Sequence, residues 1–104
     1  MTTTKKREDY YIIRTFSAGA YFAKIKKRVG KEAVLADARK ICEWTEAETL
    51  LEASRYGVGK DSVITCTVDE VTVTEVVAAI RCTPLAVQRF MEHPQSKHYR
   101  GEDK

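Results

Sequence analysis

The 104-residue sequence predicts a small α+β domain, with an antiparallel sheet of five or six strands and two short helices. Runs of β-branched and aromatic residues are separated by short turns containing glycine, as expected for hairpins. Two segments carry helix start and stop signals. Hydrophobic residues make up 43% of the chain, enough for a core, and no apolar run approaches the ~20 residues of a membrane span.

The first half of the chain is predicted to form strands. Aromatic and β-branched residues fill 9–16, and a loosely alternating pattern follows over 20–28. Gly30 suits a turn that needs positive φ. Two further strands are expected over 32–35 and 38–44.

The second half is predicted to contain both helices. Thr45 and Glu48 form a capping-box pattern, and Gly57 provides a stop, so a helix is expected over about 46–56. Thr83 and Pro84 are typical of a helix start, and that helix is expected to end before Pro94.

Between the two helices we expect strands over 62–68 and 71–81, separated by a break at Asp69-Glu70. Residues 74–80 also fit a helix, but we favour a strand because Thr83-Pro84 starts a helix afresh. The polar ends, 1–8 and 94–104, are predicted to be a disordered arm and tail around one domain at 9–93. The N-terminal stretch MTTTKKRED lacks an apolar segment, so we expect no signal peptide. We therefore expect a cytoplasmic location.

The formal charge of +3 is too small to mark a nucleic-acid or membrane binder, but it is unevenly distributed. Residues 1–31 carry nine basic and two acidic groups, residues 32–80 four and ten, and residues 81–104 five and three. The basic first third favours a local positive surface that meets a small anion. The alternative is a solvated strand face with a solubilising arm.

The reactive residue types point away from catalysis and metal binding. Three cysteines in a chain without a leader argue against a disulfide framework, and no second Cys or His lies within four positions of any of them. Buried free thiols are the simpler interpretation. The two histidines, His93 and His98, stand at a helix end and in the tail, which is unsuited to a catalytic triad. We therefore expect no enzyme activity, no cofactor and no metal.

A nucleotide pocket is one interpretation of the N-terminal strands. Small residues at Ser17-Ala18-Gly19 would let backbone amides approach a phosphate, and Arg14 offers a bidentate fork beside them. Aromatic residues including Tyr21 and Trp44 could stack on a base. The alternatives are an ordinary hairpin loop with core aromatics, or a lysine-rich stripe over 24–31 that binds RNA or DNA. No groove-reading motif supports the second alternative, so a polymeric nucleic acid is not favoured.

The segment YYIIRTFSAGAYFAKIKKRVGKEAVLADARKICEW, followed by TEAETLLEASRYGV, resembles a family of small phage and prophage proteins. The shared pattern is an R-T-aromatic-S-A-G strand and loop, a G-K-E hairpin return, an A-R-K strand ending in Trp, and a helix ending in Gly-Val. The later VDEVTVTEVVAAIRCT is similar too, so the resemblance covers about 10–90. The chain departs from the pattern at Cys42, where an aromatic is usual, and at Thr45-Glu46-Ala47.

The family is similar to phage anti-defence sponges that counter Thoeris or cyclic-oligonucleotide (CBASS) immunity. That resemblance implies a homo-oligomer in the host cytoplasm that sequesters a cyclic nucleotide or cyclic ADP-ribose signal without cleaving it. It also implies the site residues, with phosphate contacts from Arg14, Ser17, Ala18, Gly19 and Arg39, and a base packed on Trp44 or Tyr21. An inhibitor that binds a host protein, as anti-CRISPR proteins do, is the competing expectation.

Overall fold

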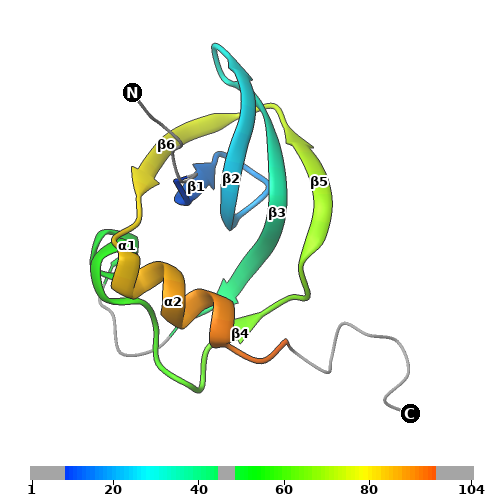
Figure 1. Cartoon of the computed structure of the whole chain (residues 1–104). Helices are drawn as coiled ribbons and strands as arrows, with labels where there is room; N and C mark the ends of the chain where they lie inside the picture. The colour runs from blue at the N-terminus through cyan, green and yellow to red at the C-terminus, as the bar shows by residue number, and fades with distance from the viewer. Residues whose placement is uncertain (1–8, 45–48, 96–104) are drawn as a thin grey trace, which may run out of the picture.

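The computed structural model describes residues 9–44 and 49–95, which form one curled sheet with two helices against it (Figure 1). The elements in chain order are β1 (Tyr11–Thr15), β2 (Ala20–Val29), β3 (Glu32–Glu43), α1 (Leu50–Tyr56), β4 (Val63–Ile64), β5 (Val68–Val73), β6 (Val76–Arg81) and α2 (Pro84–Glu92). This architecture confirms the predicted fold class of a small antiparallel sheet with two short helices.

The sheet is built on the meander β1-β2-β3, and later strands extend it at both ends. β6 pairs with β1, while β4 and β5 both pair with the long strand β3. All pairings are antiparallel. The sheet curls until the β5–β6 connection meets the β1–β2 and β2–β3 turns: Phe16 donates its amide to Glu75 O (2.9 Å), and Val76 donates to Lys31 O (2.9 Å).

Apolar residues form two cores, one on each face of the sheet. The helix-side core joins both helices to the sheet, and at its centre Phe22 stacks on Tyr10 and on Phe90 with ring centroids 4.6 Å apart in each pair. The inner core fills the concave side of the curl and includes Ile13, Leu35 and Val73. The alternation of β1 explains the division, because Ile12 faces the helices and Ile13 faces the inside of the curl.

The two strands predicted over 32–35 and 38–44 are in fact the single strand β3, so that prediction is wrong. Asp37 lies at the supposed break with φ of +52°, and its carboxylate binds Lys24 Nζ at 2.8 Å. The pairing register between β2 and β3 shifts between Phe22 and Lys24 of β2, opposite this part of β3. A bulge therefore absorbs the irregular residue and the strand continues past it.

The first helix begins later than the predicted residue 46. The Thr49 side chain accepts a hydrogen bond from the Glu52 amide (3.2 Å), and Leu50 is the first helical residue. The capping pattern at Thr45 and Glu48 lies outside the described residues. The predicted stop is confirmed, because Gly57 has φ of +82° and donates its amide to Ala53 O.

The second helix matches its prediction closely. Thr83 accepts from the Ala86 amide at 3.2 Å and Pro84 opens the helix, which ends at Glu92. In the preceding segment three predictions are wrong. The strand expected over 62–68 is reduced to the two-residue β4, and residues 65–67 are not strand. Asp69 and Glu70 lie inside β5 instead of breaking a strand, and the strand expected over 71–81 is divided by a turn at Thr74-Glu75. Of the ambiguous residues 74–80, those from 76 onward are strand, as favoured, whereas 74 and 75 lie in the turn.

The predicted arm at 1–8 lies outside the described residues, as does the predicted tail from 96 onward. Among the helices of the described chain, none is long and apolar enough to cross a membrane.

Cys82 lies in the helix-side core, where burial raises the pKa of its thiol to about 12 from the ordinary value of 9.0. Above pH 9 the unfolded chain therefore loses this proton while the folded chain keeps it. The resulting stabilisation is complete below about pH 9 and is lost as the pH rises towards about 12. In the wild type, the free energy of unfolding should fall by up to about 1.4 kcal/mol per pH unit in this range. We expect Cys82→Ala to lack this fall. Urea titrations between pH 8 and 10.5 test this, and equal slopes for both proteins would contradict it.

Candidate functional site

A groove of about 460 Å³ opens on the helix side of the sheet, between α1 and the β1–β6 ladder. Its volume is within the range of small-molecule sites, roughly 300–1,000 Å³. Its walls are mostly apolar, with one guanidinium and one indole among them. The lining residues are Arg14, Trp44, Thr49, Leu50, Leu51, Ala78 and Ile80.

Arg14 reaches the groove because of its place on β1. It lies on the same, helix-facing side of the strand as Ile12 and one residue before the strand end at Thr15. Its neighbours in the ladder are Ala20 and Ala78, both small. Arg14 is exposed and therefore available to an anion.

Trp44 follows the end of β3 and forms another wall of the groove. Its side chain is 36% exposed, which leaves part of the indole face open to a ligand. Leu51 of α1 stands beside it and is 66% exposed. Two of the residues expected from the sequence, Arg14 and Trp44, are thus brought together by elements thirty residues apart.

The bend at Ser17-Ala18-Gly19 is exposed, but its polar groups are partly engaged within the protein. The Ala18 amide donates to Thr15 Oγ1 (2.8 Å), and the same hydroxyl donates to Gly19 O (2.8 Å). Ser17 Oγ donates to the Glu75 carboxylate. A carboxylate at the bend disfavours an anion there, so the bend is less suited than Arg14 to meet a phosphate.

Arg39 is 5% exposed and is held by the protein itself. Its Nε donates to Thr65 O (2.7 Å), and its Nη1 donates to Phe90 O (2.6 Å) and His93 O (2.8 Å). Burial lowers the pKa of this guanidinium. Arg39 does not line the groove of Arg14, and it fastens the C-terminal end of α2 to β3.

Tyr21 does not meet the groove either. It stands on β2 opposite Ile13 and packs against the inner core, on the concave side of the sheet. Its aromatic ring is thus used for packing, as the simpler interpretation of the aromatic residues proposed. The hypothesis of a combined site placed Tyr21 and Arg39 near Arg14, and the structure separates all three.

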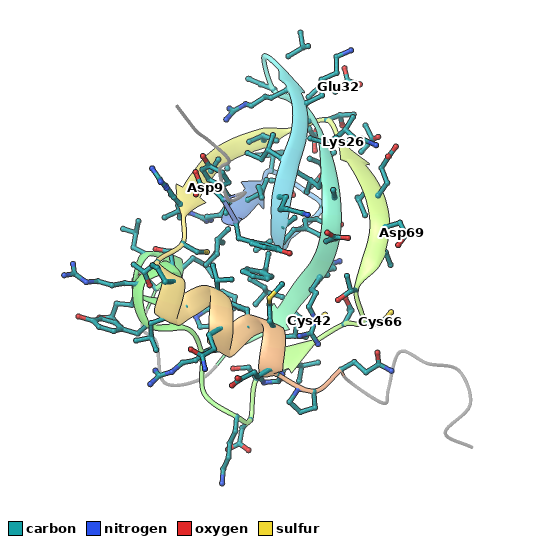
Figure 2. The ribbon with its side chains drawn as sticks, in the orientation of Figure 1. Asp9, Lys26, Glu32, Cys42, Cys66 and Asp69 are labelled. Atoms are coloured by element: carbon teal, nitrogen blue, oxygen red, sulfur yellow. The ribbon has the colours of Figure 1, made fainter. Side chains whose placement is uncertain are left out.

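Two of the three lysines of β2 are paired with acids. Lys24 binds Asp37 and Lys26 binds Glu70, each at 2.8 Å, and Glu70 raises the pKa of Lys26 through this hydrogen bond. Arg28 donates to Gly30 O at 3.1 Å. Figure 2 shows Lys26 and Glu32 towards the β2–β3 hairpin, so acids interrupt the stripe that a polyanion would follow.

Besides Thr49, the cap of α1, four other groove residues escaped sequence reasoning: Leu50, Leu51, Ala78 and Ile80. All are apolar and carry no chemical signal of their own. Leu50 and Leu51 start a helix whose beginning was misplaced, and Ala78 and Ile80 belong to the segment of ambiguous secondary structure. No cluster of three or more His, Cys, Asp or Glu side chains that could hold a metal occurs within 9–44 and 49–95.

The protein is thus a small α+β domain whose apolar groove is lined by one exposed guanidinium, that of Arg14, and one indole, that of Trp44. Residues 8–90 match the family model described as a domain of unknown function (DUF6948), and the chain belongs to that family. The comparisons gave no match to a curated protein or to a solved structure.

Proposed function

We propose that the protein binds a small nucleotide signal in the groove between Arg14 and Trp44 and sequesters it without cleavage. The single observation that supports this most is the meeting of an exposed guanidinium and a half-open indole in one groove of about 460 Å³. A guanidinium binds a phosphate by charge-assisted hydrogen bonds, and an indole stacks on a base. A ligand packed on the apolar walls would displace water from the groove, which strengthens both contacts.

The proposed ligand class is a cyclic oligonucleotide or a cyclic ADP-ribose derivative, and the proposed role is that of a phage anti-defence sponge in the host cytoplasm. Sequestration requires affinity and stoichiometry instead of turnover. A protein that only sequesters its ligand needs no general base or nucleophile beside the groove. Arg14 and Trp44 supply the two contacts that a phosphate linked to a base requires.

A thermal-shift screen tests the proposal. Cyclic di- and trinucleotides and cyclic ADP-ribose isomers are added separately, with linear AMP and ATP as controls. We expect one cyclic class to raise the melting temperature, because a ligand that binds only the folded state stabilises it by mass action. A ligand at 100 times its dissociation constant adds about 2.7 kcal/mol. The absence of a shift with every cyclic compound would contradict the proposal.

A second candidate function is inhibition of a host protein by surface contact. A larger groove of about 680 Å³ runs beside α2, with apolar walls that include Tyr10, Val87 and Met91. Met91 is 56% exposed. Co-purification of one host protein in stoichiometric amount, lost in Met91→Asp but kept in Arg14→Ala, would favour this function over nucleotide binding.

A further inference from the structure

The groove between α1 and the β1–β6 ladder offers few groups that can bind a nucleotide. Of the described residues that line it, Arg14 is the one basic side chain, Trp44 is the one aromatic ring, and none is acidic. A cation holds a phosphate and an aromatic face holds a base, so each group serves one part of a ligand. The number of such groups therefore limits which nucleotides the groove can hold.

Basic side chains on the neighbouring elements are engaged in other places. On α1, Arg55 lies over the ring of Tyr56, 5.7 Å from its centroid. On α2, Arg89 donates to Tyr56 O at 2.8 Å. On β3, Arg39 is buried and donates to the carbonyls at the end of α2. Within residues 9–44 and 49–95, the groove is thus lined by a single guanidinium.

A single guanidinium can hold two phosphates only when they are adjacent. Arg14 is exposed, and a guanidinium carries five N–H donors in a planar fork. Such a fork can donate to oxygens of two phosphates that are linked directly, as in a diphosphate. In a cyclic dinucleotide a ribose separates the two phosphates and they lie on opposite sides of the ring. One guanidinium therefore reaches only one phosphate of a cyclic dinucleotide.

The β6 side of the groove is short and is lined by a small residue beside Arg14. Ala78 and Ile80 line this side, two residues apart on the same face of β6, a length of about 7 Å. Ala78 is the direct ladder partner of Arg14, and its methyl group leaves the space beside the guanidinium open. One flat ring system covers this length, with its phosphate end beside Arg14 and its face towards Trp44.

We propose that the groove binds a cyclic nucleotide with one base and two adjacent phosphates, the chemical class of the cyclic ADP-ribose isomers. The inference rests on the proposed function and narrows its ligand. A cyclic di- or trinucleotide would leave each base after the first without an aromatic partner among the described groove residues, and each phosphate after the first without a cation. A ligand with one base and a diphosphate needs one stacking face and one guanidinium fork, which Trp44 and Arg14 supply.

Calorimetric titration of the wild-type chain compares the two ligand classes. The probes are the cyclic ADP-ribose isomers and, against them, cyclic di-AMP, cyclic di-GMP and cyclic GMP-AMP. We expect one cyclic ADP-ribose isomer to bind with one ligand per chain. Its dissociation constant should be at least about tenfold below that of every cyclic dinucleotide, because it gains a second charge-assisted phosphate contact. A cyclic dinucleotide that binds equally well or better would overturn the inference.

A larger side chain at Ala78 tests where the base lies. We expect Ala78→Leu to weaken binding of the cyclic ADP-ribose isomer at least about tenfold, because the leucine fills the space beside Arg14. Val77→Leu is the control, since Val77 is 56% exposed on the same strand and does not line the groove. The melting temperature without ligand verifies that both variants fold, and Ala78→Val replaces a leucine variant that does not. Binding to the residue 78 variant as tight as to the control would overturn the inference.

The failure of this inference differs from the failure of the proposed function. A cyclic dinucleotide that binds most tightly, with binding lost in Arg14→Ala, overturns the one-base ligand and leaves sequestration of a cyclic nucleotide in the groove in place. The absence of binding by every cyclic compound overturns the proposed function, and the inference with it.

Discussion

Replacing Arg39 with methionine is expected to lower the free energy of unfolding by about 3–5 kcal/mol, because three carbonyls each lose a hydrogen bond from a charged donor. The buried guanidinium donates to three carbonyls, at 2.7 Å to Thr65, 2.6 Å to Phe90 and 2.8 Å to His93. Methionine keeps the length of the side chain but offers no donor, so the carbonyls lose partners that they cannot replace inside the protein. A small domain has only about 5–15 kcal/mol of stability, and the loss is a large share of it.

Urea denaturation measures this effect, with Arg28→Met as the control because Arg28 is exposed on β2. We expect the control to change the unfolding free energy by less than about 0.5 kcal/mol. Arg39→Lys should fall between the two, since one ammonium does not span three carbonyls as a planar fork does. If Arg39→Met lowers the free energy of unfolding by less than about 1 kcal/mol, the guanidinium does not hold α2 against β3.

Replacing Arg14 with alanine is expected to weaken nucleotide binding about 100-fold while leaving the fold unchanged. Hydrogen bonds to a charged group contribute roughly 1.5–3 kcal/mol, and a bidentate phosphate contact is among the stronger of these. The side chain is exposed, so its removal should alter stability by less than about 0.5 kcal/mol. Arg14→Lys should recover part of the affinity, because the charge remains and the fork is lost.

The readout is the fluorescence of Trp44, which is the only tryptophan in the chain and lines the same groove as Arg14. We expect a bound base to quench its emission in the wild type and in Arg28→Ala, whose guanidinium lies outside the groove. In Arg14→Ala the same quenching should need about 100 times more ligand. Equal titration curves for Arg14→Ala and wild type would place the ligand elsewhere.

The sequence predicted the fold class because its signals were local. The caps of α2, the glycine turn at Gly30 and the alternating strands are each set by a few neighbouring residues. Asp37 misled the prediction because a bulge lets a strand absorb one residue with positive φ, and that depends on the pairing of β3 with β2 and β5. Asp69 and Glu70 misled it because acids are suited to an edge strand, and edge position is a property of the whole sheet.

The site was harder to predict, since residue type does not show what surrounds a side chain. Arg14 and Arg39 have the same guanidinium, yet one is open to solvent and the other is buried against the end of α2. Arg39 lies on β3 where α2 meets the sheet, and Arg14 lies on β1 beside the groove. Tyr21 of β2 packs on the inner core, whereas Trp44 follows β3 and lines the groove. The apolar walls of the groove carry no chemical motif, and they become visible only when α1 meets β6.

Binding without cleavage is tested most directly by recovering the ligand. Protein is incubated with the cyclic nucleotide that shifts its melting temperature, freed of unbound ligand by gel filtration and then denatured, and the supernatant is analysed by mass spectrometry. We predict intact cyclic ligand in fixed stoichiometry to the wild-type chain and none from Arg14→Ala. Linear or hydrolysed products, or equal retention by both proteins, would contradict sequestration in the Arg14–Trp44 groove.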